Sequence, residues 1–208
     1  MWYNTNLPSE LIDGIVEDLE DINEDHMQES IVGFEGGNVD HDIRNSANIW
    51  LPVNHWIGQL LSSYVERANR ENFLYDLDYI ENDNIQYTKY DVGQFYHWHT
   101  DSDLCTHLTP MDMNIYHSTD RVTQSEIDVN LNAERIRKLS FSLQLSDPDD
   151  YEGGNLQMQY GCSNPLFYAP RTKGSLTIFD SRVHHRVKKV TKGVRRSLVG
   201  WVSGPRWR

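Results

Sequence analysis

The chain has 208 residues, of which 38% are hydrophobic, so it can form one sizeable core and is short for two domains. Its net charge of −12 disfavours nucleic acid as the main partner, and no segment approaches the roughly 18 uncharged apolar residues that span a bilayer. Only Cys105 and Cys162 are present, so we expect a soluble protein of the reducing cytoplasm without disulfides, a zinc knuckle or a membrane partner.

The N-terminal part of the chain predicts two amphipathic helices. Apolar residues recur there at helical spacing, after Pro8-Ser9 and again after Pro52 and Asn54. The two sets are Leu11, Ile12, Ile15, Val16, Leu19 and Ile22, and then Trp56, Ile57, Leu60, Leu61, Tyr64, Val65 and Ala68. Residues 33–45 between them read as a loop or an irregular strand. We therefore expect residues 1–75 to be mainly helical and to support a core formed by the rest of the chain.

From about Asp76 the pattern changes to short β-type runs separated by turn signals. The predicted strands are 84–90, 94–101, 139–145, 155–160, 175–179, 185–190 and 197–202, with turns at Gly93, Asp147-Pro148, Gly153-Gly154 and Lys192-Gly193. Helices followed by about seven strands predict an α+β fold in which N-terminal helices pack against a double-sheet jelly roll, or double-stranded β-helix, over residues 76–208.

Residues 102–136 interrupt the strand series. They contain Pro110, Met111 and Met113, and a short helix is predicted near residues 125–137. Long connections inside compact domains often cover binding sites. We expect this segment to be a lid-like insertion over a substrate.

The last part of the chain is basic in an otherwise acidic sequence. From Arg171 onward there are eleven Lys and Arg residues and a single acid, Asp180. Such a segment can attract phosphate, but in a globular fold it more often lies beside acidic parts of its own chain. We expect the second arrangement here.

The sequence His99-Thr100-Asp101, followed far downstream by His185, offers the ligands of a facial iron(II) site. Alternate side chains of a strand point to the same face, so residues 99 and 101 can meet one ion. The same alternation allows other sets, because His97 and Asp103 continue it and His184 precedes His185. Two imidazoles and one carboxylate leave coordination positions open, which favours chemistry over structural bracing.

Residues 90–101 match the pattern Tyr-x-x-Gly-x-x-Tyr-x-x-His-x-Asp, which resembles the strand pair of iron(II)- and 2-oxoglutarate-dependent prolyl hydroxylases. Residues 137–140, 151–156, 179–187 and 190–201 are similar to later segments of that family, in the same order. The likeness is closest to its small bacterial and viral branch, the prolyl 4-hydroxylase-like and PKHD-type hydroxylases. Asp180 and Lys189 stand where that group usually has proline.

The resemblance implies a role for each candidate site residue. The metal ligands are His99, Asp101 and His185, by register with the family motif. Arg195 would hold the far carboxylate of 2-oxoglutarate, since a guanidinium is a permanent cation with paired donors. Ser197, Tyr90 and Gln144 would lie near that carboxylate, and Tyr96, Trp98 and Trp201 would form walls for the substrate. The implied cofactors are iron(II), 2-oxoglutarate and O2, with ascorbate in support.

The implied function is hydroxylation of an unactivated C–H, with succinate and CO2 as coproducts. A peptidyl proline in a protein or peptide is the favoured acceptor. A free amino acid or another small molecule is the alternative, because one fold and one metal site serve many acceptors. A cupin-type metal-binding barrel without oxygenase activity is a third hypothesis, since His97-Trp98-His99 imitates a cupin histidine pair. It would not need Arg195.

Overall fold

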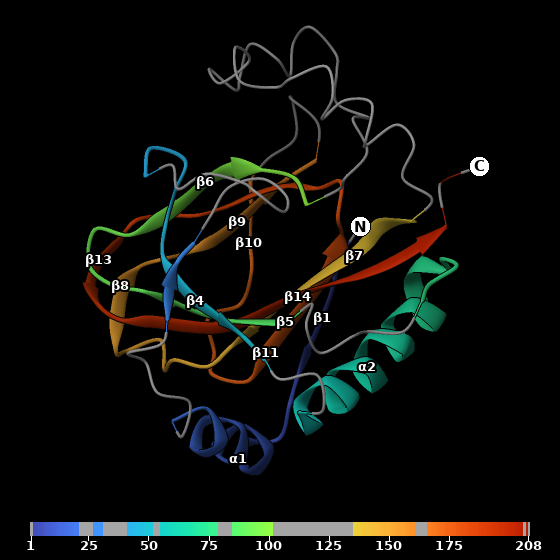
Figure 1. The fold of residues 1–208 in the computed structure, drawn as a ribbon, viewed down its shortest axis with the longest axis horizontal. Coiled ribbons are helices and arrows are strands. Elements are labelled where there is room, and N and C mark those ends of the chain that lie inside the picture. Colours follow the sequence, from blue (N-terminus) through green and yellow to red (C-terminus); the bar gives the residue numbers. More distant parts are fainter. Residues whose placement is uncertain are drawn as a thin grey trace, which may run out of the picture.

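The computed structural model describes residues 2–20, 27–30, 41–51, 55–78, 85–101, 135–160, 166–205 and 207. Its strands form two main antiparallel sheets and a two-stranded ribbon (Figure 1). The larger sheet has the order β1 (Trp2–Asn6), β11 (Ser175–Asp180), β7 (Arg135–Gln144), β14 (Arg195–Pro205), β5 (Ile85–Tyr90), β4 (Ala47–Trp50) and β2 (Gln28–Glu29). The smaller sheet has the order β10 (Phe167–Tyr168), β9 (Leu156–Gln159), β12 (His184–Val187), β6 (Phe95–His99) and β3 (Arg44–Asn45). The ribbon pairs β13 (Val190–Gly193) with β8 (Tyr151–Gly153).

Two helices cover the outer face of the larger sheet (Figure 1). They are α1 (Ser9–Glu20) and α2 (Trp56–Ala68), and a π-helical turn, Asn69–Phe73, continues α2. Both helices begin where the apolar periodicity predicts them to begin, and His55 caps α2 by accepting a hydrogen bond from the backbone N of Ile57 at 3.4 Å. Of the described helices, none is long and apolar enough to cross a membrane.

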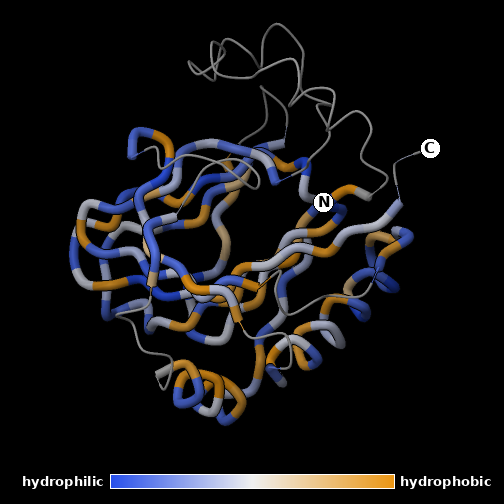
Figure 2. The backbone as a smooth tube through the Cα atoms, in the orientation of Figure 1, coloured by the Kyte–Doolittle hydropathy of each residue, from blue (hydrophilic) through white to orange (hydrophobic). Residues whose placement is uncertain are grey.

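The two faces of the larger sheet differ in chemistry, because the side chains alternate along each strand. In β11, Leu176 and Ile178 pack into the hydrophobic cluster formed with the helices, whereas the buried Ser175 and Thr177 face the other way. Hydrophobic and hydrophilic residues alternate in the same way along other strands (Figure 2). The outer face therefore supplies the core, and the inner face, which looks toward the smaller sheet, is unusually polar for a buried surface.

The structure differs from the predicted elements in several places. Strands β1 to β4 come from the region expected to be mainly helical, and β1 is a mostly polar segment that gains its partner only from β11. The predicted strand 185–190 is two strands, because β12 ends at Val187 and pairs with β6 and β9, while β13 begins at Val190 and pairs with β8. The predicted turn at Lys192-Gly193 lies within β13.

The predicted lid-like insertion and its short helix fall mostly outside the described residues. Residues 102–134 are not described, and Arg135–Arg137, predicted to end the helix, are instead the first residues of β7. The lid-like role of this segment and the division of the chain into a single domain stay predictions.

Two cations of the basic segment lie against acids from earlier in the chain, as predicted. Lys173 is 3.0 Å from Asp13 of α1, and Lys192 is 3.2 Å from Glu152 of β8. Both pairs are on the surface, where an ion pair contributes at most about 1 kcal/mol. They reduce the local excess of positive charge more than they stabilise the fold.

A glycine at the end of β13 is required by the backbone. Gly193 has φ +69°, and a Cβ at this position would lie 1.9 Å from the backbone oxygen of Asp150. We expect Gly193→Ala to lower the free energy of unfolding by at least about 2 kcal/mol in urea denaturation. Gly14→Ala is the matched control, since Gly14 lies inside α1 and an added Cβ would meet no atom within 4 Å beyond its chain neighbours and the backbone of its own helix. It should raise the free energy of unfolding by about 0.5–1 kcal/mol, and an equal loss in both variants would contradict this account.

Candidate metal centre

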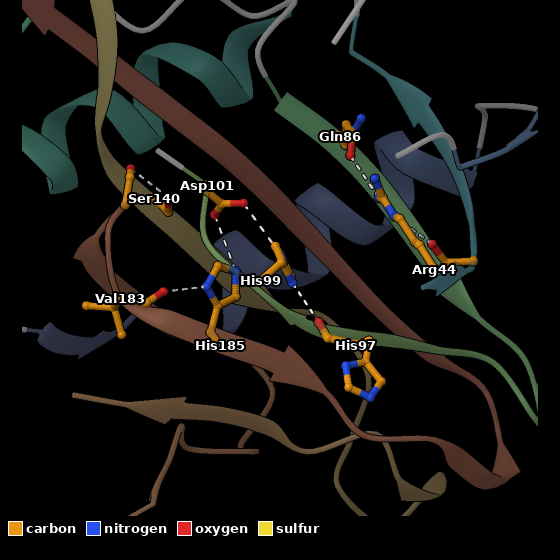
Figure 3. A network of polar contacts seen from close by, with 10 residues as sticks. Arg44, Gln86, His97, His99, Asp101, Ser140, Val183 and His185 are labelled. Atoms are coloured by element: carbon orange, nitrogen blue, oxygen red, sulfur yellow. Dashed lines mark hydrogen bonds and ion pairs between the residues drawn. The ribbon is translucent and has the colours of Figure 1, made fainter. Parts of the chain in front are cut away.

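Three side chains with metal-ligating atoms converge between β6 and β12. His99 is the last residue of β6, His185 lies directly opposite it in β12, and Asp101 follows two residues after the strand. The Nε2 atom of His99 is 3.5 Å from Oδ1 of Asp101, and the Nε2 atom of His185 is 3.3 Å from its Oδ2 (Figure 3). Ligands bonded at about 2.1 Å to one metal ion at right angles lie about 3 Å apart. The three side chains, which we call the triad, therefore fit a single ion.

The geometry that joins His99 to Asp101 differs from the simple alternation expected of a strand. The pairing of β6 with β12 shifts between His185 and Val187, so that His185 faces His99 but Val187 faces Tyr96. This bulge turns Tyr96 to the same side as His99, and their rings stack with centroids 3.5 Å apart. Asp101 lies beyond the strand, where its backbone N–H donates to the carbonyl oxygen of Ser181 at 2.9 Å.

Backbone carbonyls orient both imidazoles. Nδ1 of His99 lies 2.8 Å from the carbonyl oxygen of His97, and Nδ1 of His185 lies 2.9 Å from that of Val183 (Figure 3). In each case the acceptor is two residues earlier in the chain. A proton on Nδ1 that is donated to a carbonyl leaves Nε2 as the free lone pair for a metal. Both Nε2 atoms point toward Asp101 (Figure 3).

The electrostatics of the triad favour a bound cation. Burial and the neighbouring His185 together lower the pKa of His99 to about 4, although Asp101 opposes both effects. Burial alone would raise the pKa of Asp101, but the two imidazoles, His185 foremost, hold it well below its usual range. Burial alone would lower the pKa of His185, but Asp101 outweighs this and raises it. The carboxylate thus stays ionised in a buried place, where a divalent ion can replace the proton of His185.

Arg195 lies in the same cavity as the triad. It is the first residue of β14, its side chain is almost fully buried, and the cavity walls include Tyr90, Tyr96 and Trp201. Its guanidinium donates to the hydroxyl of Ser197 at 3.2 Å and lies 5.5 Å from the ring of Tyr90. Among the described residues, no carboxylate pairs with Arg195. A buried guanidinium with neutral neighbours is a site for an anion.

Five of the other predicted site residues lie at or beside this cavity. Tyr90, Tyr96 and Trp201 line the cavity, and Ser197 contacts Arg195 directly. Gln144 lies beside a neighbouring small cavity that also reaches Arg195, and its amide donates to the hydroxyl of Tyr151 at 3.1 Å.

Trp98 is not among the described residues that line this cavity, and its role as a substrate wall stays a prediction. The guanidinium of Arg186 covers its ring at 4.6 Å. The bulge in the pairing of β6 with β12 removes the strict alternation that would have put residues 96 and 98 on one face.

The alternative ligands considered from the sequence do not join the triad. The ring of His97 is exposed and points away from Asp101 (Figure 3). His184 belongs to β12 but lies outside the cavity that holds His185. Asp103 lies outside the described residues.

Two further residues line the cavity without a role assigned to them from the sequence, Arg44 and Phe179. Arg44 is buried in the short strand β3, and its guanidinium lies 4.7 Å from the ring of Tyr96. It also donates to Gln86 at 3.2 Å (Figure 3). Phe179 makes an edge contact with His185 at 4.8 Å. Arg44 comes from a segment that reads as loop, and only the pairing of β3 with β6 brings it to the cavity.

The turn that joins β11 to β12 holds an ion pair. Asp180 ends β11 and accepts hydrogen bonds from the backbone N, Nε and Nη2 of Arg182 at 2.9, 2.9 and 2.6 Å. The hydroxyl of Tyr75 donates to the same carboxylate at 2.6 Å. Burial alone would raise the pKa of Asp180, but these hydrogen bonds outweigh it and hold the pKa below its ordinary value of 3.8.

This shift predicts a pH dependence of stability. Because the folded state lowers the pKa of Asp180, the ion pair stabilises the protein above pH 3.8, and this contribution is lost as the pH falls below that value. We expect Asp180→Asn to lower the free energy of unfolding by about 2 kcal/mol at pH 7. The difference from the unaltered chain should shrink below about pH 4.

Urea denaturation between pH 3 and 7 measures this difference. The control is Asp13→Asn, which removes an exposed acid from α1 and should change the free energy by no more than about 0.5 kcal/mol. A difference between Asp180→Asn and the unaltered chain that stays constant across the pH range would contradict the assignment.

A family model described as "2OG-Fe(II) oxygenase superfamily" matches residues 85–203 of the chain. The match begins with β5 and ends within β14, so it covers the triad and Arg195.

Curated relatives match over shorter segments. A PKHD-type hydroxylase of Synechococcus elongatus is 45% identical over 64 residues, which are 31% of this chain and 28% of the relative. A PKHD-type hydroxylase of Stutzerimonas stutzeri is 38% identical over 90 residues, which are 42% of this chain and 36% of the relative. The matched segments thus span well under half the length of these relatives.

Solved structures match nearly the whole chain at low identity. A prolyl-4-hydroxylase of Pseudomonas putida has a TM-score of 0.66 and 18% identity, over 99% of this chain and 93% of that one. A prolyl hydroxylase of Trichoplax adhaerens, solved with a hypoxia inducible factor peptide fragment, has a TM-score of 0.69 and 16% identity, over 97% and 82%. These likenesses confirm the predicted fold, a double-stranded β-helix with supporting helices.

Proposed function

The chain belongs to the 2OG-Fe(II) oxygenase superfamily, and on this basis we propose that it is a dioxygenase that hydroxylates a peptidyl proline. Iron(II), 2-oxoglutarate and O2 are its cofactor and cosubstrates. When bound, the iron supplies the oxygen activation that couples decarboxylation of 2-oxoglutarate, to succinate and CO2, with insertion of one oxygen atom into a C–H bond. The cytoplasm, favoured by the two cysteines, is the proposed compartment.

The observation that carries this proposal is the shared cavity of the triad and Arg195. The ligating atoms of His99, Asp101 and His185 all lie within 4.8 Å of one another. Arg195 lines the same cavity and carries a permanent positive charge. A dicarboxylate that contacts a metal at one end therefore has a cation for its other end. A barrel that only binds metal has no need of the second feature.

The chain's own residues perform three tasks in this reaction. The two imidazoles and the carboxylate of Asp101 would hold the iron on one side, so that its other positions stay open. Arg195, with the hydroxyl of Ser197 against it, would bind and orient 2-oxoglutarate. Tyr90 and Phe179, both buried in the cavity wall, would exclude water from the reacting atoms.

The aromatic wall of the cavity supports a proline acceptor. Trp201 lines the cavity, and its ring lies 5.9 Å from that of Trp50, a residue that is 44% exposed. The guanidinium of Arg137 lies over the ring of Trp201, 4.3 Å from its centroid. An extended peptide can pack its proline rings on such aromatic faces, as in other recognition of polyproline segments. The solved neighbours named prolyl hydroxylases give further support.

The test is a coupled assay of succinate and acceptor mass. Purified protein with iron(II), ascorbate and 2-oxoglutarate is mixed with a proline-rich peptide, with the same peptide carrying alanine for proline, or with free proline. We expect succinate and a mass gain of one oxygen atom only with the first peptide. Product from free proline alone would favour the small-molecule alternative. No succinate under any condition would favour a metal-binding barrel without oxygenase activity.

A further inference from the structure

The turn between β11 and β12 holds two of the three triad residues through its backbone. The carbonyl oxygen of Ser181 accepts the N–H of Asp101 at 2.9 Å, and that of Val183 accepts Nδ1 of His185 at 2.9 Å. Asp101 is not part of a strand, so its place depends on this contact. Whatever fixes the shape of residues 180–183 therefore also fixes the separation of two metal ligands.

The turn is closed by a backbone hydrogen bond from the N–H of Val183 to the carbonyl oxygen of Asp180 at 2.9 Å, and side chains outside the cavity reinforce it. Asp180 binds Arg182 across Ser181 through three hydrogen bonds. The backbone N–H of Arg182 shares a peptide unit with the carbonyl of Ser181, so this carbonyl cannot rotate without breaking the hydrogen bond from that N–H. Ser181 is also bonded to β7, from its N to the carbonyl oxygen of Lys138 at 3.1 Å and between its hydroxyl and that of Ser140 at 2.9 Å.

A tryptophan beyond the last strand closes over this ion pair. The indole ring of Trp207 lies between two cations, with Nζ of Lys138 at 3.5 Å and the guanidinium carbon of Arg182 at 4.1 Å from the ring centroid. The ring of Tyr75 meets it edge-on at 4.6 Å. The indole N–H of Trp207 is buried and has no hydrogen-bond partner among the described residues, so cation–π and aromatic contacts hold the ring in place.

These side chains form one cluster, which we call the Trp207 latch. Its members are Tyr75, Lys138, Asp180, Arg182 and Trp207. None of them lines the cavity of the triad and Arg195. They come from four separate parts of the chain: the segment after α2, strand β7, the β11–β12 turn and the end of the described chain.

We propose that the Trp207 latch is a positioning device for the metal site. It holds the carbonyl oxygens of residues 181 and 183 at the spacing that Asp101 and His185 need to bind one ion. The inference rests on the proposed metal site and goes beyond it, because it assigns a role in metal affinity to residues that touch neither metal nor substrate. Removing a residue that hydrogen-bonds to a metal ligand and orients it typically weakens metal binding by about 10–100-fold.

The test measures metal binding without turnover. Co(II) is titrated anaerobically into the full chain, and its visible absorption reports affinity and coordination, since Co(II) accepts the same ligands as iron(II). We expect Asp180→Asn and Trp207→Ala each to weaken Co(II) binding about 10-fold and to alter the Co(II) spectrum. Trp207→Phe, which keeps an aromatic face for the two cations, should recover most of the affinity lost in Trp207→Ala.

Two controls separate positioning from loss of folding. Trp56→Ala removes a partly exposed tryptophan from α2, and Asp13→Asn removes an exposed acid from α1, so both should bind Co(II) as the unaltered chain does. In the latch variants saturated with Co(II), the affinity for 2-oxoglutarate should stay within about twofold, because Arg195 is held by β14.

Unchanged Co(II) affinity and spectrum in both Asp180→Asn and Trp207→Ala would overturn the proposal, even if both variants unfold at lower temperature. If Asp180→Asn does not fold, Tyr75→Phe decides, because it removes only the hydroxyl that donates to Asp180. Co(II) affinity equal to that of the unaltered chain in Tyr75→Phe would then overturn it. Because the titration needs no succinate, its result is independent of the assay for the proposed function.

Discussion

An Arg195→Ala variant is expected to bind 2-oxoglutarate at least about 30-fold more weakly than the unaltered chain. Removing one partner of a buried, hydrogen-bonded charge pair costs about 2–5 kcal/mol, because the other charge is left without compensation. By the proposed binding mode, the remaining charge would be the far carboxylate of the cosubstrate, in a cavity where Arg195 is 3% exposed. Quenching of tryptophan fluorescence on titration of 2-oxoglutarate into the Co(II)-loaded protein measures the affinity.

The matched control for this prediction is Arg196→Ala. Arg196 is the next residue of β14, and it faces a different cavity, lined by Val16 and Leu19 of α1. We expect this variant to bind 2-oxoglutarate as the unaltered chain does. Arg195→Lys should give an intermediate affinity, because an ammonium keeps the charge but not the fork of two donors. Equal losses in Arg195→Ala and Arg196→Ala would argue that the cosubstrate carboxylate binds elsewhere.

Removal of either triad residue bound to the β11–β12 turn is expected to abolish metal-dependent turnover. In His185→Ala and Asp101→Ala we expect succinate formation to fall at least about 100-fold. The loss of a metal ligand should have a larger effect than the loss of a residue that only hydrogen-bonds to a ligand, which typically costs about 10–100-fold. Affinity for iron(II) should fall in parallel. The carboxylate of Asp101 is what raises the pKa of His185, so in Asp101→Ala the imidazole of His185 should titrate at a lower pH.

His97→Ala is the control for the triad variants. Its exposed imidazole is only two residues from His99, and it was a candidate ligand on sequence grounds. The carbonyl oxygen that accepts Nδ1 of His99 belongs to the backbone and remains in the variant. We expect full metal affinity and turnover. Loss of both in His97→Ala, with retention in His185→Ala, would mean that a different set of ligands binds the ion.

The helices and most strands could be predicted because their signals are local. In α2 the apolar spacing from Trp56 to Ala68 marks both ends of the observed helix. The first strand could not be found this way, because Trp2–Asn6 is largely polar and pairs with β11 across more than 160 residues of chain. Its partner is set by the tertiary fold and not by its own propensity.

In the candidate site too, residues with a recognisable spacing along the chain could be predicted, whereas residues placed by the pairing of distant strands could not. The spacing of His99, Asp101, His185 and Arg195 along the chain resembles a known pattern, and the structure brings these four residues to one cavity. The side of β6 to which Trp98 belongs could not be inferred, because it depends on a bulge that arises only when β6 pairs with β12. Nor could Arg44, which enters the cavity from a two-residue strand with no pattern of its own.

The polar inner face of the larger sheet has a consequence for the life of the protein in the cell. Buried hydroxyls such as those of Ser175 and Thr177, together with the guanidinium of Arg195, forgo much of the hydrophobic gain that a barrel interior normally provides. A ligand whose carboxylate pairs with Arg195 contributes folding free energy by mass action, about 2.7 kcal/mol at a hundred times its dissociation constant. The abundance of such an enzyme can thus follow the supply of its cosubstrate, because chains without bound cosubstrate unfold more often and are degraded by proteases first.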